Sequence, residues 1–199
     1  MTEPAWIRMI SDDEADDVLN AVFDLARTPH GTLDNVMRVH SLRPATMTGH
    51  VTLYRSVLHN DDNQIPLWFL ETVSSYVSIL NNCPYSLTHH WANASRLMDD
   101  PVRSDAVRAA LDAHRPEDAF EGHELAMLRY AGKLTTDVCA LEKSDVDAMK
   151  AEGCTDGEIL EVNQVVAYFN YSNRLLNGLG VSTAGDTVGY YKARNGEQS

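Results

Sequence analysis

The stretch ETVSSYVSILNNCPYSLTHH, residues 71–90, decides how this chain folds, because it reads as one helix, a turn and a second helix. Apolar side chains before the turn recur at three- and four-residue spacing: Leu70, Val73, Val77 and Leu80. This spacing predicts a helix over residues 66–80 with one buried face. The pair Asn81-Asn82 predicts its end, since asparagine tolerates left-handed backbone angles.

The second helix is predicted to begin at Pro84, because the first helical position does not need a backbone N–H. Cys83 then becomes the N-cap. A thiol at the positive end of a helix dipole can have its pKa lowered from about 8.5 toward about 3.5 to 7.5, so Cys83 is predicted to be nucleophilic. Ser86 and His90 follow at i+3 and i+7, which predicts sulfur, hydroxyl and imidazole on one helix face, with His89 pointing elsewhere.

Glu71 is predicted to face His90 when the two helices fold back on each other, because the two residues lie at similar distances from the turn. A carboxylate beside an imidazole orients the ring and supports its protonated form, as a proton relay requires. Each residue alone also has an ordinary interpretation. Cys83 could be a small buried residue, and Glu71, Ser86 and His90 could be plain helix residues, so the hypothesis of a site depends on their joint spacing.

This spacing resembles a known family. Glu71, eleven residues, Cys83-Pro84-Tyr85-Ser86, three residues and His90 are similar to the E-x11-C-x-x-C-x-x-x-H signature of the alkylhydroperoxidase D-like branch of the carboxymuconolactone decarboxylase superfamily. Residues 123–135 and 159–181 resemble its long "uncharacterised peroxidase-related enzyme" subgroup. The resemblance covers residues 30 to 190. It implies an all-α multi-helix bundle and a homo-oligomer: a dimer, trimer or hexamer.

The sequence departs from the signature at Ser86, where redox-active members have the cysteine that attacks peroxide. An internal disulfide with Cys83 cannot form, so the two-cysteine mechanism does not transfer. The resemblance leaves Glu71 and His90 as proton-relay residues, Cys83 as a lone thiol and Ser86 as a hydroxyl that can hydrogen-bond His90. Tyr85 stands at a supporting position where a relay histidine can occur.

Three functions fit these residues. In the first, an antioxidant oxidoreductase, the Cys83 thiolate reduces an organic hydroperoxide, Glu71 and His90 supply the proton, and an external thiol restores the cysteine. In the second, Glu71 and His90 carry out non-redox acid/base chemistry on a small carboxylate, lactone or acyl compound, as in a decarboxylase, lyase or hydrolase. In the third, the chain is an inactive oligomeric scaffold or binding protein.

Composition predicts one compact domain, since 199 residues with 44% hydrophobic content can bury one core. We expect an N-terminal helical arm over residues 1–60 and a core over residues 61–185. The chain has no run of 18 apolar residues and its first residues, MTEPAWIRMISDDEADD, are acidic, which predicts a soluble cytoplasmic protein without a membrane partner. Three cysteines argue against a disulfide framework, and Cys139 and Cys154 are predicted to be packing residues.

A net charge of −13 argues against a nucleic-acid partner, because phosphate binding needs clustered lysine and arginine. Glu71, Cys83, His89 and His90 are all possible metal ligands. Adjacent helical histidines diverge by about 100°, however, so no metal site is predicted. No glycine-rich nucleotide motif is present, so no cofactor is expected.

The rest of the chain also reads as helices. Residues 11–14, Ser-Asp-Asp-Glu, form a predicted capping box before Val18, and Thr155 to Glu158 form another. Further helices are predicted over residues 48–58, 105–113, 121–134, 143–151 and 156–176. Residues 178–191 are predicted to be a loose end.

A faint repeat suggests a pseudo-duplicated helical core. Tyr85-Ser86 and Tyr171-Ser172 each follow an acidic residue at similar spacing, Glu71 and Glu158. The second copy lacks the cysteine and the histidine.

Overall fold

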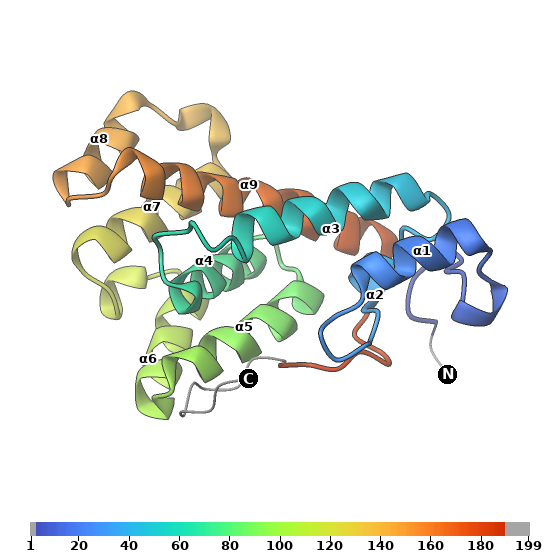
Figure 1. Cartoon of the computed structure of the whole chain (residues 1–199). Coiled ribbons are helices and arrows are strands. Elements are labelled where there is room, and N and C mark those ends of the chain that lie inside the picture. The colour runs from blue at the N-terminus through green and yellow to red at the C-terminus, as the bar shows by residue number, and fades with distance from the viewer. Residues whose placement is uncertain (1–2, 190–199) are drawn as a thin grey trace.

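The computed structural model describes residues 3–189, and this part of the chain folds into helices without any β-strand, as predicted (Figure 1). None of these helices is both long and apolar enough to cross a membrane. The α-helices are α1 (Asp17–Ala26), α2 (Asn35–Arg38), α3 (Pro44–Leu58), α4 (Leu67–Leu80), α5 (Pro84–Met98), α6 (Pro101–Asp112), α7 (Gly122–Thr136), α8 (Lys143–Ala151) and α9 (Asp156–Leu179). Short 3₁₀ helices cover Asp12–Glu14, Pro116–Asp118 and Val138–Ala140.

Helix starts differ from the predicted ones where proline begins the helix. Pro44 and Pro101 each occupy the first turn, so α3 and α6 begin four residues before their predicted starts. A proline there has a suitable φ and needs no hydrogen-bond acceptor. At α6 the side chain of Asp100 also accepts a hydrogen bond from the Arg103 backbone N–H, 3.0 Å away.

The predicted capping box at Ser11 and Glu14 forms, but it caps the short 3₁₀ helix rather than α1. Ala15 then returns to extended backbone, and α1 begins at Asp17. The N-cap of α1 is Asp16, whose carboxylate accepts from the Leu19 backbone N–H at 2.8 Å. Because Asp16 is the N-cap, α1 begins after the predicted capping box and not within it.

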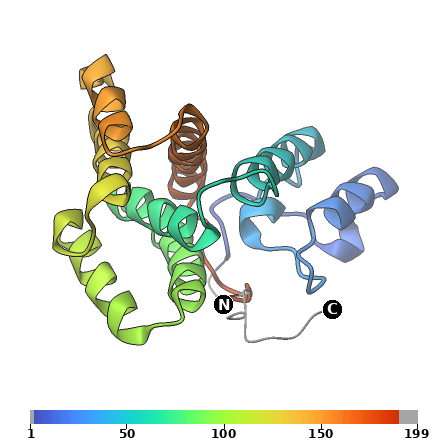
Figure 2. The ribbon, with the colours of Figure 1, turned by 60° about the vertical axis from the view of Figure 1, so that its left-hand side comes forward.

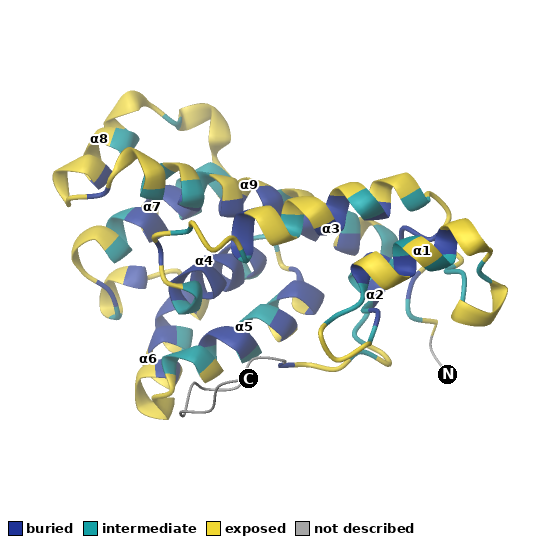
Figure 3. Cartoon of the chain, viewed as in Figure 1, coloured by how far each residue is buried: buried dark blue, intermediate teal, exposed yellow. Residues whose placement is uncertain are grey.

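Helix α4 runs through the centre of the core. Every residue from Phe69 to Ser78 is buried, because α5, α7 and α9 pack around it (Figure 3). The prediction of a single buried face was therefore wrong. Ser74 and Ser78 remain compatible with this interior because each donates its hydroxyl to the carbonyl four residues earlier, at 2.6 and 2.7 Å.

The N-terminal helices have an apolar cluster of their own, formed by Leu19, Phe23, Ala26, Leu33, Met37, Met47 and Val51. Figures 1 and 2 place α1 and α2 on one side of the molecule and α6, α7 and α8 on the other. Helices α3 and α9 contact each other and link the two sides. The candidate site lies where these groups meet.

The C-terminal segment after α9 packs back onto the fold, so the prediction of a loose end was wrong for residues 181–189. The Asn35 side chain donates to the carbonyls of Ser182 and Ala184, at 2.9 and 3.0 Å. The Asp186 carboxylate accepts from the Asn35 backbone N–H at 3.0 Å. These partners are far apart in sequence, which local turn signals cannot reveal. Tyr190 and Tyr191, also in the predicted loose end, lie outside the described residues.

The predicted repeat is not supported by the settings of its members. Tyr85 and Ser86 open α5, whereas Tyr171 and Ser172 lie within α9. Glu71 is fully buried, whereas Glu158 belongs to the capping box of α9. The two acidic residues therefore have different roles.

Loss of the α9 cap should weaken the fold. Thr155 Oγ1 accepts from the Glu158 backbone N–H at 3.1 Å, and Glu158 Oε2 accepts from the Thr155 N–H at 2.7 Å. We expect Thr155→Ala to lower the free energy of unfolding by about 1 kcal/mol in chemical denaturation. Thr52→Ala, at an exposed position of α3, is the control and should change it by less than about 0.5 kcal/mol. Equal effects would contradict a capping role.

Candidate functional site

Glu71 and His90 meet as the turn predicted. Asn82 adopts the left-handed conformation, with φ of 49°, and folds α5 back along α4. Glu71 Oε2 lies 2.6 Å from His90 Nδ1, and the carboxylate is 0% exposed. Asn93, one turn further along α5, donates its Nδ2 to Glu71 Oε1 at 3.2 Å. A fully buried carboxylate thus has a donor for each oxygen.

This contact determines which nitrogen of His90 can act on a substrate. An ionised carboxylate only accepts hydrogen bonds, so Nδ1 carries a proton and Nε2 is the free nitrogen of the neutral ring. The ring packs edge-on against Phe169, with centroids 4.5 Å apart. The contacts with Glu71 and Phe169 therefore fix the orientation of the His90 ring.

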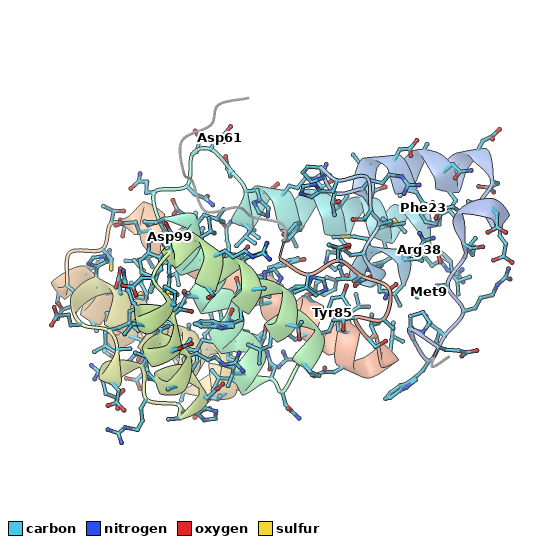
Figure 4. All side chains as sticks on the ribbon, turned by 90° about the horizontal axis from the view of Figure 1, so that it is seen from below. Met9, Phe23, Arg38, Asp61, Tyr85 and Asp99 are labelled. Carbon is cyan, nitrogen blue, oxygen red and sulfur yellow. The ribbon has the colours of Figure 1, made fainter. Side chains whose placement is uncertain are left out.

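A cavity of about 790 Å³ adjoins this pair, within the range of ordinary ligand sites. Helix α5 contributes Tyr85, Ser86, His89, His90 and Asn93 to its lining. The N-terminal helices and α9 supply the other walls, which include Val36, Val51, Tyr54, Tyr168 and Leu176. Figure 4 shows Tyr85 between α5 and the N-terminal helices. The cavity therefore lies between α5 and α9 on one side and the N-terminal helices on the other.

Cys83 is not part of this cavity lining. It is 1% exposed and packs in a small apolar cluster with Ala5, Val39, Tyr85, Leu176 and Val181. Burial raises the pKa of the Cys83 thiol, and the amides of Ser86 and Tyr85 lower it by less. The prediction of a lowered pKa was wrong because desolvation outweighs the helix N-terminus. Sulfur, hydroxyl and imidazole do not share one accessible face.

Ser86 lines the cavity, but it is hydrogen-bonded to Ser78 of α4 rather than to His90. The two hydroxyl oxygens are 2.8 Å apart, and Asn173 donates to Ser78 at 3.4 Å. The predicted hydrogen bond between Ser86 and His90 is therefore absent from the contacts of these residues. Ser86 nonetheless lies one turn before His90 on the same side of α5.

Tyr85 holds the C-terminal segment instead of serving in a relay. Its hydroxyl donates to Asp186 and accepts from the Val36 backbone N–H at 3.0 Å. Burial and the Asp186 carboxylate raise the pKa of Tyr85 well above its usual value. His89 also faces the cavity, contrary to prediction, with Nε2 3.5 Å from Asp186 Oδ2. No sequence motif marked Asp186.

A second row of hydrogen-bonded side chains reaches the cavity, and no pattern in the sequence had indicated it. The hydroxyl of Tyr168, in the cavity wall, lies 2.7 Å from His50 Nε2. His50 Nδ1 lies 2.8 Å from His40 Nε2, and His40 Nδ1 lies 2.9 Å from Thr46 Oγ1. Burial and the neighbouring His40 lower the pKa of His50 to about 3. His40, Thr46 and His50 lie in or just before α3, whereas Tyr168 belongs to α9, so no local spacing could have linked the histidines to Tyr168.

The remaining cysteines and the possible metal ligands are readily placed. Cys154 is buried in the main apolar cluster, as predicted, whereas Cys139 is exposed, so its predicted packing role was wrong. Within residues 3–189, no group of three histidine, cysteine, aspartate or glutamate side chains is arranged to hold a metal ion.

Sequence comparison gives no relative: no family model matches the chain, and neither does any curated protein. Solved structures do match. A peroxidase-related protein from Ralstonia eutropha JMP134, described as an alkylhydroperoxidase AhpD core, is 18% identical, with a TM-score of 0.79 over 92% of this chain and 94% of its own. A peroxidase-related protein from Silicibacter sp. TM1040 is 21% identical, with a TM-score of 0.76 over 91% of this chain and 92% of its own.

A third similar structure is the debrominase Bmp8. It is 18% identical and has a TM-score of 0.71 over 92% of both chains. A cysteine-to-alanine variant of this enzyme is also solved, in complex with 2,3,4-tribromopyrrole. The similarity extends over nearly the whole of each chain while identity stays near one residue in five. The chain therefore has the fold of the alkylhydroperoxidase AhpD core.

Proposed function

We propose that the cavity is the active site of a non-redox enzyme in which Glu71 and His90 move protons on a small, mostly apolar carbonyl compound such as a lactone or an ester. The observation that carries the proposal is the setting of His90. Its Nδ1 is held by a buried carboxylate 2.6 Å away, and the residue lines a cavity of about 790 Å³. The Cys83 thiol, by contrast, is buried away from that lining.

The chemistry begins at His90 Nε2. This nitrogen takes a proton from a water molecule that attacks the carbonyl, and Glu71 stabilises the imidazolium that results. The imidazolium then returns the proton to the leaving oxygen. A positioned general base of this kind accelerates a reaction by about 10²- to 10⁴-fold. The chain's own residues supply every proton transfer.

A thiol peroxidase is the second candidate, supported by the peroxidase-related proteins and the debrominase that share the fold. In this reaction the Cys83 thiolate attacks the outer oxygen of a hydroperoxide, which gives a sulfenic acid and an alkoxide that takes a proton from His90. An external thiol then reduces the sulfenic acid. The packing around Cys83 would have to open first, since this residue is 1% exposed.

Substitution of Cys83 separates the two candidates. We expect Cys83→Ala to hydrolyse dihydrocoumarin, a lactone, and p-nitrophenyl acetate as fast as the unmodified protein, because the thiol takes no part in proton transfer. Cys139→Ala, at an exposed position, is the matched control. The same proteins are assayed with cumene hydroperoxide and dithiothreitol. Turnover of the hydroperoxide that disappears in Cys83→Ala and persists in Cys139→Ala would support the thiol peroxidase instead.

A further inference from the structure

We propose that the cavity binds a neutral aromatic hydroxyl compound, a ligand of the phenol class, whose O–H group donates to acceptor atoms of the protein. This inference rests on the function proposed above, because it names the kind of compound that reaches His90. Three cavity residues carry it: His90 and Asn93 on one side of α5, and Tyr168 of α9. In each of them an acceptor atom remains after the hydrogen bonds made inside the protein.

The first two acceptors follow from the carboxylate of Glu71. Its oxygens can only accept, so the Nδ1–H of His90 and the Nδ2 amide group of Asn93 are both directed at it. His90 is left with Nε2 as an acceptor. Asn93, which is 5% exposed, is left with Oδ1, a buried oxygen that has no hydrogen-bond partner within the described chain. An unpartnered buried carbonyl oxygen is costly unless a ligand donates to it.

Ser86 adds a hydroxyl group to the same side of the cavity. Ser78 Oγ donates to the Ser74 carbonyl oxygen at 2.7 Å and to Ser86 Oγ at 2.8 Å. The Ser86 oxygen therefore already accepts a hydrogen bond inside the protein, and it does not count among the acceptors offered to the ligand.

The third acceptor is the hydroxyl oxygen of Tyr168, which follows from the hydrogen bonds made by His40 and His50. Thr46 Oγ1 donates its proton to the Arg43 carbonyl oxygen, 2.8 Å away. His40 Nδ1 must therefore carry the proton of its bond to Thr46, which makes His40 Nε2 an acceptor for His50 Nδ1–H. His50 Nε2 then accepts from the Tyr168 O–H, and the phenolic oxygen, which also interacts with the Ser172 hydroxyl, keeps a lone pair for a ligand.

The two arginine side chains in the lining already make ion pairs or hydrogen bonds within the protein. Arg27 is paired with Asp12 at 2.7 Å and with Asp24 at 3.3 Å. Arg55 donates to two backbone carbonyls at the C-terminal end of α1, at 2.9 and 3.4 Å. An anion beside His90 would meet the buried carboxylate of Glu71 directly behind it. A neutral donor avoids that repulsion.

The rest of the lining favours an aromatic body. Tyr54 and Tyr168 pack with ring centroids 5.8 Å apart, and Val36, Val51 and Leu176 complete an apolar surface. A flat ring system buries its faces against such walls. The cavity of about 790 Å³ has room for two fused rings.

Three ligands of the same shape test the inference on the unmodified protein by isothermal titration calorimetry: 2-naphthol, its methyl ether and 2-naphthoate. We expect 2-naphthol to bind at least about tenfold more tightly than either of the others, because the ether cannot donate and the carboxylate is repelled. Equal or tighter binding of the ether or the carboxylate overturns the proposal. No binding of 2-naphthol at its solubility limit overturns it as well.

A pair of tyrosine variants tests the assigned acceptor. Tyr168→Phe should weaken 2-naphthol binding about 3- to 10-fold and leave the ether unchanged. Tyr76→Phe, a buried tyrosine outside the cavity, should affect neither ligand. If Tyr168→Phe weakens both ligands equally, or neither, Tyr168 is not the acceptor and the proposal fails. Binding is measured without turnover, so 2-naphthol binding in a protein that hydrolyses no ester would contradict the proposed function alone.

Discussion

Replacing Glu71 by glutamine is expected to lower kcat for hydrolysis of dihydrocoumarin by about 10²- to 10⁴-fold. Glutamine keeps the size of the side chain but can offer an N–H to His90 Nδ1, which the carboxylate 2.6 Å away cannot. The imidazole can then carry its proton on Nε2, so the nitrogen that faces the cavity stops acting as a base. Loss of the negative charge also removes the stabilisation of the imidazolium.

The control for this variant is Glu161→Gln. Glu161 also accepts hydrogen bonds through both oxygens, from the backbone N–H groups of Gln64 and Ile65, but it lies outside the cavity. Its loss should leave kcat unchanged. Nitrogen-15 NMR of labelled histidine provides a second readout, because the proton of His90 should move from Nδ1 to Nε2 in Glu71→Gln. An unchanged kcat together with a moved proton would contradict the catalytic role of His90.

The part of the site that sequence predicted depends on short separations along the chain. Glu71 and His90 are 19 residues apart, and one asparagine turn determines that they face each other. Helix periodicity and a tight turn suffice to place such a pair. The all-α class followed from the same patterns, and helix starts were misplaced mainly where proline or a second N-cap residue opened the helix.

What the sequence could not predict depends on segments that are distant in the chain. The helix N-terminus at Cys83 predicted a reactive thiol, but Cys83 packs in an apolar cluster with Ala5 and Val181, and burial raises the pKa of the thiol. Asp186 meets Tyr85 across 101 residues, and His50 meets Tyr168 across 118. A single sequence carries no local signal for contacts of this length. The acceptor-rich lining of the cavity therefore became visible only in the assembled fold.

His50 is expected to make the stability of the fold strongly dependent on pH. Burial and the neighbouring His40 lower the pKa of His50 to about 3, whereas an unfolded chain has the ordinary histidine value of about 6.5. Between these values the unfolded state binds a proton that the folded state does not. The contribution of neutral His50 to the free energy of unfolding is therefore complete above pH 6.5, and it is lost as the pH falls toward 3. From pH 7 to pH 4, His50 alone should lower the free energy of unfolding by about 3 kcal/mol.

Urea denaturation at a series of pH values, with a matched pair of variants, isolates this contribution. Glutamine at position 50 can still donate and accept a hydrogen bond but does not titrate, so His50→Gln should be less stable than the unmodified protein at pH 7 and should approach it toward pH 4. His123→Gln, at an exposed position, should leave the pH dependence unchanged. Burial also lowers the pKa values of His40 and His59. These two histidines are present in the unmodified protein and in each variant, so they make the same contribution to each plot of stability against pH. Parallel curves for His50→Gln and the unmodified protein would show that His50 is not held neutral, and the tautomer chain that ends at Tyr168 would then lose its basis.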